Sequence, residues 1–143
     1  KEDLRDWMSF HRNEAGEWLR HGAAIYLDRC VAPVVKGLTV RRGANGLLMN
    51  RTSYGSFRDC DISFNSAVGL GMYRSSENVI ERNRLDYNVR GFSYGVYNRG
   101  QDSAAILLFE DCDRNVIRRN SATHSGDGFF LWAGQSTMDT GVG

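Results

Sequence analysis

The amino-acid sequence predicts an all-β solenoid of about five coils of 22–23 residues. Three observations lead to this prediction: an internal repeat, a strand-like spacing of apolar residues within each repeat, and Asn and Gly residues that recur between the strands. A single unit of this length cannot bury its apolar face alone, so the core must form between stacked units. We therefore expect successive coils to lie directly on one another.

The repeat is clearest in two nearly identical segments. Residues 77–83 read ENVIERN, and residues 114–120 read RNVIRRN, 37 positions later. One glycine position recurs at intervals of 23, 22 and 37 residues, at Gly46, Gly69, Gly91 and Gly128. A unit of 22–23 residues with one excess of 14 residues, at 92–105, accounts for all of these intervals.

Aligned on this repeat, the apolar residues fall into columns. The strand that opens each unit has two inward positions two residues apart, which is the period of a strand. The first holds Leu47, Leu70, Leu107 and Phe129, and the second holds Met49, Met72, Phe109 and Leu131. Later columns are Phe57, Ile80 and Ile117, then Ile62, Leu85 and Ala122, then Phe64, Tyr87 and His124. Three short strands per unit indicate a parallel β-helix whose coils pair at about 4.8 Å.

Asn residues recur at matching points between the strands. The pairs are Asn78 with Asn115, Asn83 with Asn120, and Asn65 with Asn88. Asn tolerates a left-handed backbone, and its amide can bond the backbone groups of a turn. We expect these side chains to stack from coil to coil as hydrogen-bonded ladders.

The pattern Asn-x-Ile-x-x-Asn, followed by a strand, an Asn and a Gly-apolar step, resembles the right-handed parallel β-helix family. That family includes pectin lyase-like proteins and NosD-type copper-processing proteins. The resemblance covers about residues 23–143. It implies a right-handed coil, an architecture that hosts lyases, hydrolases, epimerases, phage tailspikes and binding modules.

Residues 1–22 do not join the repeat. Apolar residues recur there at helical spacing, at Leu4, Trp7, Met8, Ala15, Trp18 and Leu19. We expect an amphipathic helix over most of 2–20 that caps the solenoid, with a partner-binding helix as the alternative. The sequence ends within what looks like a further coil, so we expect more coils in the natural protein.

Composition and motifs argue against several classes of partner. Lys and Arg number 18 against 17 Asp and Glu, without the basic excess of a dedicated nucleic-acid binder. No apolar run is long enough to span a membrane. No cofactor is expected, because the three His residues are far apart and no His-x-x-His pattern is present. Calcium on loop carboxylates is the alternative kept open.

The inward register of the opening strands leaves an outward strip of candidate site residues. With Met72 inward, the strip contains the substrate-binding candidates Tyr73, Phe130 and Trp132 and the catalytic candidate Glu110. An exposed aromatic strip usually marks a binding surface, and aromatic rings beside a carboxylate suit the faces and hydroxyls of sugars. The alternative is that the excess segment or another part of the chain folds over the strip.

Two carboxylates precede opening strands in neighbouring coils. Asp102 ends the segment NRGQD, and Asp127 lies within HSGDGF. Adjacent coils place such groups about 5 Å apart, or farther with loop geometry, which spans the separations used by retaining and inverting glycosidases. The Asp127-Gly128-Phe129 step also resembles that of polygalacturonases. A Gly-Asp-Gly sequence that merely turns the chain is the alternative.

Further candidates flank this pair. His124 is either a general base beside Asp127 or a buried ring within its aromatic column. Asn98, Arg99 and Tyr97 lie in the excess segment, and Arg is the bidentate partner for the carboxylate of a uronate sugar.

Together these features predict a carbohydrate-active β-helix protein that acts on a polysaccharide as a hydrolase, lyase or epimerase through an exposed strand face. The alternative is a non-catalytic glycan-binding or structural scaffold. A polysaccharide substrate suggests an extracellular or periplasmic location.

Overall fold

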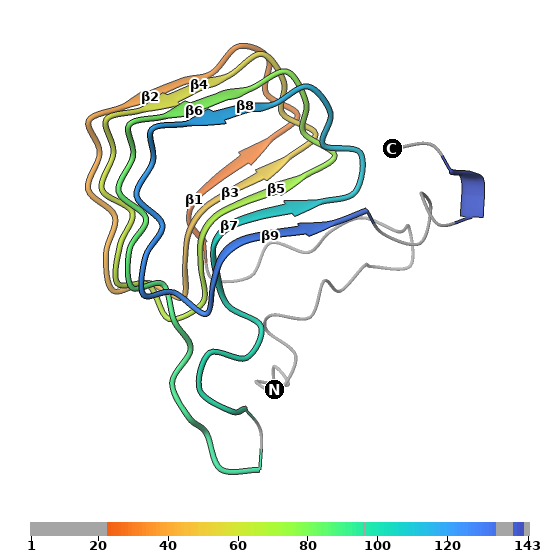
Figure 1. The fold of residues 1–143 in the computed structure, drawn as a ribbon. Coiled ribbons are helices and arrows are strands. Elements are labelled where there is room, and N and C mark those ends of the chain that lie inside the picture. The colour runs from red at the N-terminus through yellow and green to blue at the C-terminus, as the bar shows by residue number, and fades with distance from the viewer. Residues whose placement is uncertain (1–22, 96, 134–138, 142–143) are drawn as a thin grey trace.

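The computed structural model describes residues 23–95, 97–133 and 139–141. The amphipathic helix predicted over 2–20 lies outside these residues. The described chain winds into a solenoid of parallel strands, as predicted (Figure 1). Within the described residues, no helix is long and apolar enough to cross a membrane.

The strands form two parallel sheets along the solenoid. One sheet has the order β1-β3-β5-β7-β9, formed by Ala23–Asp28, Asn45–Asn50, Val68–Tyr73, Ala104–Phe109 and Asp127–Trp132. The other has the order β2-β4-β6-β8, formed by Val34–Lys36, Ser56–Arg58, Val79–Glu81 and Val116–Arg118. The predicted third strand is a row of single parallel bridges through Thr39, Asp61, Arg84 and Ser121.

The inner core runs along the axis between the sheets. Residues of the same kind stack from coil to coil in it, with fully buried Leu47 over Leu70 and Met49 over Met72. The columns predicted from the other sides of the coil also stack, since Phe57 pairs with Ile80 and Ile80 pairs with Ile117. Repeated apolar side chains thus fill the same place in each coil, which is how a solenoid buries a continuous core.

Asn ladders cross the same interior at the turns. The backbone N–H of Asn78 donates to Oδ1 of Asn115 at 2.9 Å, and that of Asn83 donates to Oδ1 of Asn120 at 2.9 Å. Asn88 belongs to a third ladder and is fully buried, as is Asn78. The predicted ladders are confirmed, and they satisfy turn backbone groups that would otherwise be buried without partners.

The predicted register is wrong by one residue in β7. Leu108 pairs with Met72, and Ile106 joins Leu108 in the inner core. Leu107 and Phe109, which the sequence placed inside, face outward instead.

The shift arises because the excess residues fall at two places. Paired residues of β5 and β7 are 36 positions apart, whereas the Asn residues that follow these strands are 37 apart. The last extra residue therefore enters after β7, at Glu110. There the backbone N–H of Arg74 donates to both Phe109 O (3.3 Å) and Glu110 O (3.1 Å), which is the pattern of a local bulge.

The glycine column changes for the same reason. Buried Ala105, not Gly91, occupies the position held by Gly46 and Gly69, and Gly91 lies on the surface. A Cβ on Gly69 would lie 2.5 Å from Asn88 Nδ2, so this coil needs a glycine there.

A second apolar cluster covers the outer face of the larger sheet. Its buried members are Leu48, Ala67, Val68, Ala104 and Leu107. The sheet is therefore buried on both faces through β3, β5 and β7, and its residues 45–50, 68–73 and 104–109 are buried throughout. Such strands read as continuous apolar runs, without alternation.

Candidate functional site

β9 is the strand of the larger sheet whose outer face is most open to solvent. All six of its residues are exposed, whereas those of the paired strand β7 are buried. Phe130 and Trp132 stand in register with buried Leu107 and Phe109, yet they are 42% and 43% exposed. The inward residues Phe129 and Leu131 are exposed as well, because no further strand of the described residues stacks on β9.

Two members of the predicted strip are not exposed, so that part of the prediction is wrong. Tyr73 is fully buried, and its ring stacks on Phe109 with centroids 5.5 Å apart. Phe109 lies 4.6 Å from the ring of Trp132 in turn. Because of the bulge after β7, Phe109 takes the outward position that the sequence assigned to Glu110. The alternative of a covered strip is correct for Tyr73.

Glu110 is an interior carboxylate. Its side chain is fully buried, and Arg74 bonds Oε2 through Nε at 3.2 Å and through Nη2 at 3.1 Å. A buried carboxylate needs such a partner to remain charged. Glu110 thus joins two neighbouring coils through an ion pair with Arg74, and it does not lie on the exposed strip.

Asp102 and Asp127 lie at the entry edge of the same sheet, as predicted. Asp127 is the first residue of β9, pairs with Ala104 of β7, and donates its N–H to Ser103 O at 2.8 Å. Asp102 precedes Ala104 by two residues, and both aspartates are exposed. Adjacent coils therefore carry the two carboxylates, and their action as an acid pair stays a prediction.

His124 belongs to an aromatic ladder on the outside of the solenoid. Its ring stacks on Tyr87 at 4.7 Å, and Tyr87 stacks on Phe64 at 4.9 Å. The predicted column is confirmed, but the predicted burial is wrong, since all three residues reach solvent. Each has a left-handed backbone, with φ of 61°, 59° and 55° along the column from Phe64. That conformation directs the rings outward from the turn.

The excess segment divides into buried and exposed candidates. Tyr97 is buried against Arg90, whose guanidinium carbon lies 4.0 Å from the ring centroid, so Tyr97 supports the loop. Asn98 and Arg99 are exposed. The backbone N–H of Asn98 donates to Gln101 Oε1 at 3.0 Å, so the loop is ordered around them.

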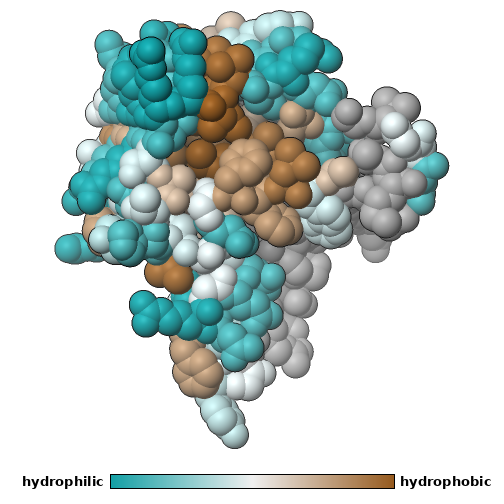
Figure 2. Space-filling view, in the orientation of Figure 1, coloured by the Kyte–Doolittle hydropathy of each residue, from teal (hydrophilic) through white to brown (hydrophobic). Residues whose placement is uncertain are grey.

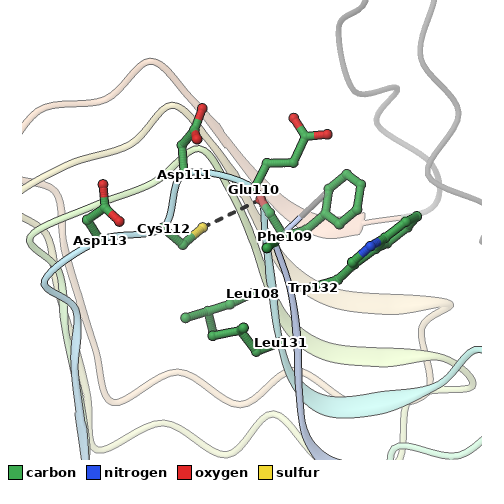
Figure 3. Close-up of a pocket in the computed structure, with 9 residues that line it drawn as sticks. Leu108, Phe109, Glu110, Asp111, Cys112, Asp113, Leu131 and Trp132 are labelled. Carbon is green, nitrogen blue, oxygen red and sulfur yellow. Dashed lines mark hydrogen bonds between the residues drawn. The ribbon is translucent and has the colours of Figure 1, made fainter. Parts of the chain in front are cut away.

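A hollow of about 250 Å³ lies where β7 and β9 end. Leu108, Leu131 and Trp132 form its apolar wall, and Asp111 and Asp113 stand at its rim with carboxylates turned away from the two leucines (Figure 3). Figure 2 shows apolar side chains gathered at this end of the solenoid. The exposed apolar residues of β8 and β9 include Val116, Phe129 and Leu131.

The thiol in this hollow is shifted away from its reactive, deprotonated form. Burial raises the pKa of Cys112, and its Sγ contacts Phe109 O at 3.6 Å. A raised pKa keeps a thiol protonated at neutral pH, whereas the thiolate is the nucleophile. Within the described residues, no group of three His, Cys, Asp or Glu side chains is placed to hold a metal ion.

Comparison with known proteins defines the class. A family model described as a right-handed beta helix region matches residues 6–140, so the chain belongs to the right-handed β-helix family. This fold is found in general in enzymes that act on polysaccharides. No curated protein and no solved structure matches the chain.

Proposed function

We propose that this protein acts on a polysaccharide that lies along the outer face of β9. Phe130 and Trp132 contact the sugar rings, and Asp102 and Asp127 are the carboxyl pair at the end of the face. The observation that carries the proposal is the arrangement of two aromatic rings, Phe130 and Trp132, on the outer side of β9, with the exposed carboxylate of Asp127 at the entry of the same strand. An exposed apolar patch rimmed by polar groups is typical of a binding surface.

The dimensions of the face support this proposal. Asp127 and Trp132 are the first and last residues of β9, and six residues of strand extend over about 16 Å. A face of this length accommodates more than one sugar ring. Aromatic side chains offer a flat apolar surface, while the carboxylate at the strand entry can bond hydroxyl groups or move a proton.

The chemistry follows from two carboxyls on adjacent coils. Separations near 5 Å serve a retaining hydrolase, and about 6.5–9.5 Å serves an inverting one. A lyase or epimerase acting on a uronate would need a cation for the sugar carboxylate, and exposed Arg99 lies three residues before Asp102. A polymer substrate of this kind also places the protein outside the cell or in the periplasm.

Affinity electrophoresis through gels containing polygalacturonate, alginate or xylan tests the binding face. We expect at least one polymer to retard the protein, and Phe130→Ala with Trp132→Ala to weaken that binding by about tenfold or more. Tyr54→Ala is the matched control, because Tyr54 is 64% exposed and lies outside the larger sheet. Retardation by none of the polymers, or equal loss in the control, contradicts the proposal.

A non-catalytic glycan-binding protein is the second candidate. The burial of Glu110 in an ion pair with Arg74 favours it, because one of the predicted catalytic carboxylates is withdrawn from the surface. Product release from the bound polymer separates the two candidates. An enzyme loses turnover but keeps binding in Asp102→Asn with Asp127→Asn, whereas a binding protein shows no turnover before or after the change.

A further inference from the structure

We propose that the loop formed by residues 91–95 and 97–102 is a second sugar-binding element, in which Phe92 and Tyr94 contact the polysaccharide and Arg90 positions them. The inference rests on the proposed function of the β9 face, and it assigns a separate set of residues to the same polymer. The loop holds most of the residues that make the β5-to-β7 spacing 36 instead of the 23 found between β3 and β5. It projects away from the solenoid before β7 begins (Figure 1).

The base of the loop is closed by a set of short hydrogen bonds. Gly100 N–H donates to Arg90 O at 2.9 Å, and Arg90 N–H donates to Ser103 Oγ at 3.2 Å. Ser103 Oγ in turn donates to Gly100 O at 2.8 Å. The two ends of the loop are therefore joined directly, and the loop leaves and rejoins the coil as a folded unit.

The side chain of Arg90 extends this support into the loop. Arg90 is only 3% exposed, stacks on the ring of Tyr97, and donates from Nη2 to Asp102 O at 3.1 Å. A planar guanidinium can stack and donate at the same time, which an ammonium group cannot do. Arg90 thus links Tyr97 to Asp102, two residues before β7 begins.

The tip is a closed turn that holds aromatic rings in solvent. Ser93 and Tyr97 exchange two backbone hydrogen bonds of 2.9 Å each, and Gly95 supplies the left-handed residue with φ of 69°. Tyr94 is 92% exposed and Phe92 is 68% exposed. Rings at this exposure add little to the core. An aromatic side chain has only two rotatable bonds, so it loses little conformational entropy when it binds, which favours a recognition role.

The base of the loop packs against the turn that leads into β9. Gly126 comes directly before Asp127, and a Cβ on it would lie 2.1 Å from Ser103 Oγ and 2.5 Å from Gly100 O. The turn that presents Asp127 therefore touches the base of the loop. A polymer that leaves β9 at Asp127 meets this loop next, and exposed Arg99 adds a cation to its surface.

Binding of chains of different length tests the loop apart from the face. We expect Phe92→Ala with Tyr94→Ala to weaken binding of the retarding polymer by about tenfold, while a disaccharide or trisaccharide of the same sugar binds within twofold of wild type. Phe130→Ala with Trp132→Ala should weaken both. Tyr54→Ala is again the control, and the melting temperature verifies that each variant is folded.

The outcomes separate the two proposals. If the β9 variant loses binding and the loop variant binds the long polymer like wild type, the loop proposal is overturned and the β9 face stands. If the loop variant loses binding and the β9 variant does not, the face is wrong and the loop stands. If no chain binds the wild-type protein, both are overturned.

Arg90→Lys tests the positioning role. The variant keeps the positive charge but loses the planar guanidinium that stacks on Tyr97. We therefore expect it to reduce the affinity for the long polymer about as much as Phe92→Ala with Tyr94→Ala does. Combined with those two changes, Arg90→Lys should cause no further loss of affinity, because it acts through the same rings. An equal loss for long and short chains, or an additive loss in the combination, would show a general structural role instead.

Discussion

Asp86 joins two neighbouring coils through its carboxylate. Ser121 Oγ donates to Oδ1 at 2.7 Å, the N–H of Thr123 donates to the same oxygen at 2.9 Å, and Arg84 Nε donates to Oδ2 at 3.0 Å. Burial raises the pKa of Asp86, but these hydrogen bonds outweigh that effect and lower it from 3.8 to about 2. Hydrogen bonds to the charged form favour that form.

This shift predicts how stability depends on pH. The unfolded chain binds the Asp86 proton more tightly than the folded protein does, so the contribution is complete above about pH 4 and is lost as pH falls through about 2. We expect Asp86→Asn to lower the free energy of unfolding at pH 7 by about 2 kcal/mol. The gap between variant and wild type should narrow in urea titrations from pH 4 to pH 2. A constant gap would contradict this account.

A buried ladder amide should matter more than an exposed one. Asn78 is fully buried, accepts from Gly55 N–H at 2.8 Å and donates to Thr52 O at 2.9 Å. Its loss leaves buried backbone groups unpaired, so we expect Asn78→Ala to cost about 2–4 kcal/mol in urea unfolding. Exposed Asn98→Ala is the control and should change stability by less than about 0.5 kcal/mol. Similar losses of stability for Asn78→Ala and Asn98→Ala would contradict a stabilising role for the Asn ladder.

At the scale of elements, sequence reasoning succeeded where one residue type repeats and failed where it does not. Met49 over Met72 and Asn78 over Asn115 were predictable because the same side chain fills the same place. The segment AAILLF of β7 is apolar at every position, so its two registers look alike in sequence. The bulge at Glu110 decides between them, and a single extra residue leaves no compositional signal.

The site was predictable to the extent that it depends on the register. Asp127, Phe130 and Trp132 lie on the exposed strand as expected. Tyr73 was predicted to be exposed because a single core inside the coil was assumed. The outer face of the sheet carries a second apolar cluster. His124 was misplaced because a left-handed backbone at a residue other than glycine cannot be read from the residue type.

Two glycines that the sequence placed in one column test the corrected register. A Cβ on Gly69 would lie 2.6 Å from Ala105 O, whereas one on Gly91 would meet nothing within 4 Å. We expect Gly69→Ala to destabilise the protein by about 1–3 kcal/mol, and Gly91→Ala to leave the melting temperature nearly unchanged. Equal destabilisation by the two changes would restore the register predicted from sequence.

At the scale of the whole molecule, the proposed site occupies one strand of the solenoid and the loop beside it. The Asn ladders and apolar columns occupy the interior. Charged pairs lie on the smaller sheet, as Arg118 with Glu81 does, or directly after its strands, as Arg82 with Asp59 does. Among the described strands of the larger sheet, β9 is the most exposed, and it follows the loop of residues 91–95 and 97–102 by one coil. Fold and site are thus separable, as expected for an architecture that hosts many functions.

The most direct test of the β9 face is the indole N–H resonance of Trp132 in a two-dimensional nitrogen–proton spectrum. The protein has three tryptophans, so Trp132→Phe assigns the signal by its disappearance. On titration with oligosaccharides cut from a retarding polymer, we expect this resonance to shift progressively and saturate with the bound fraction. Saturable binding that leaves the Trp132 resonance in place would contradict the account.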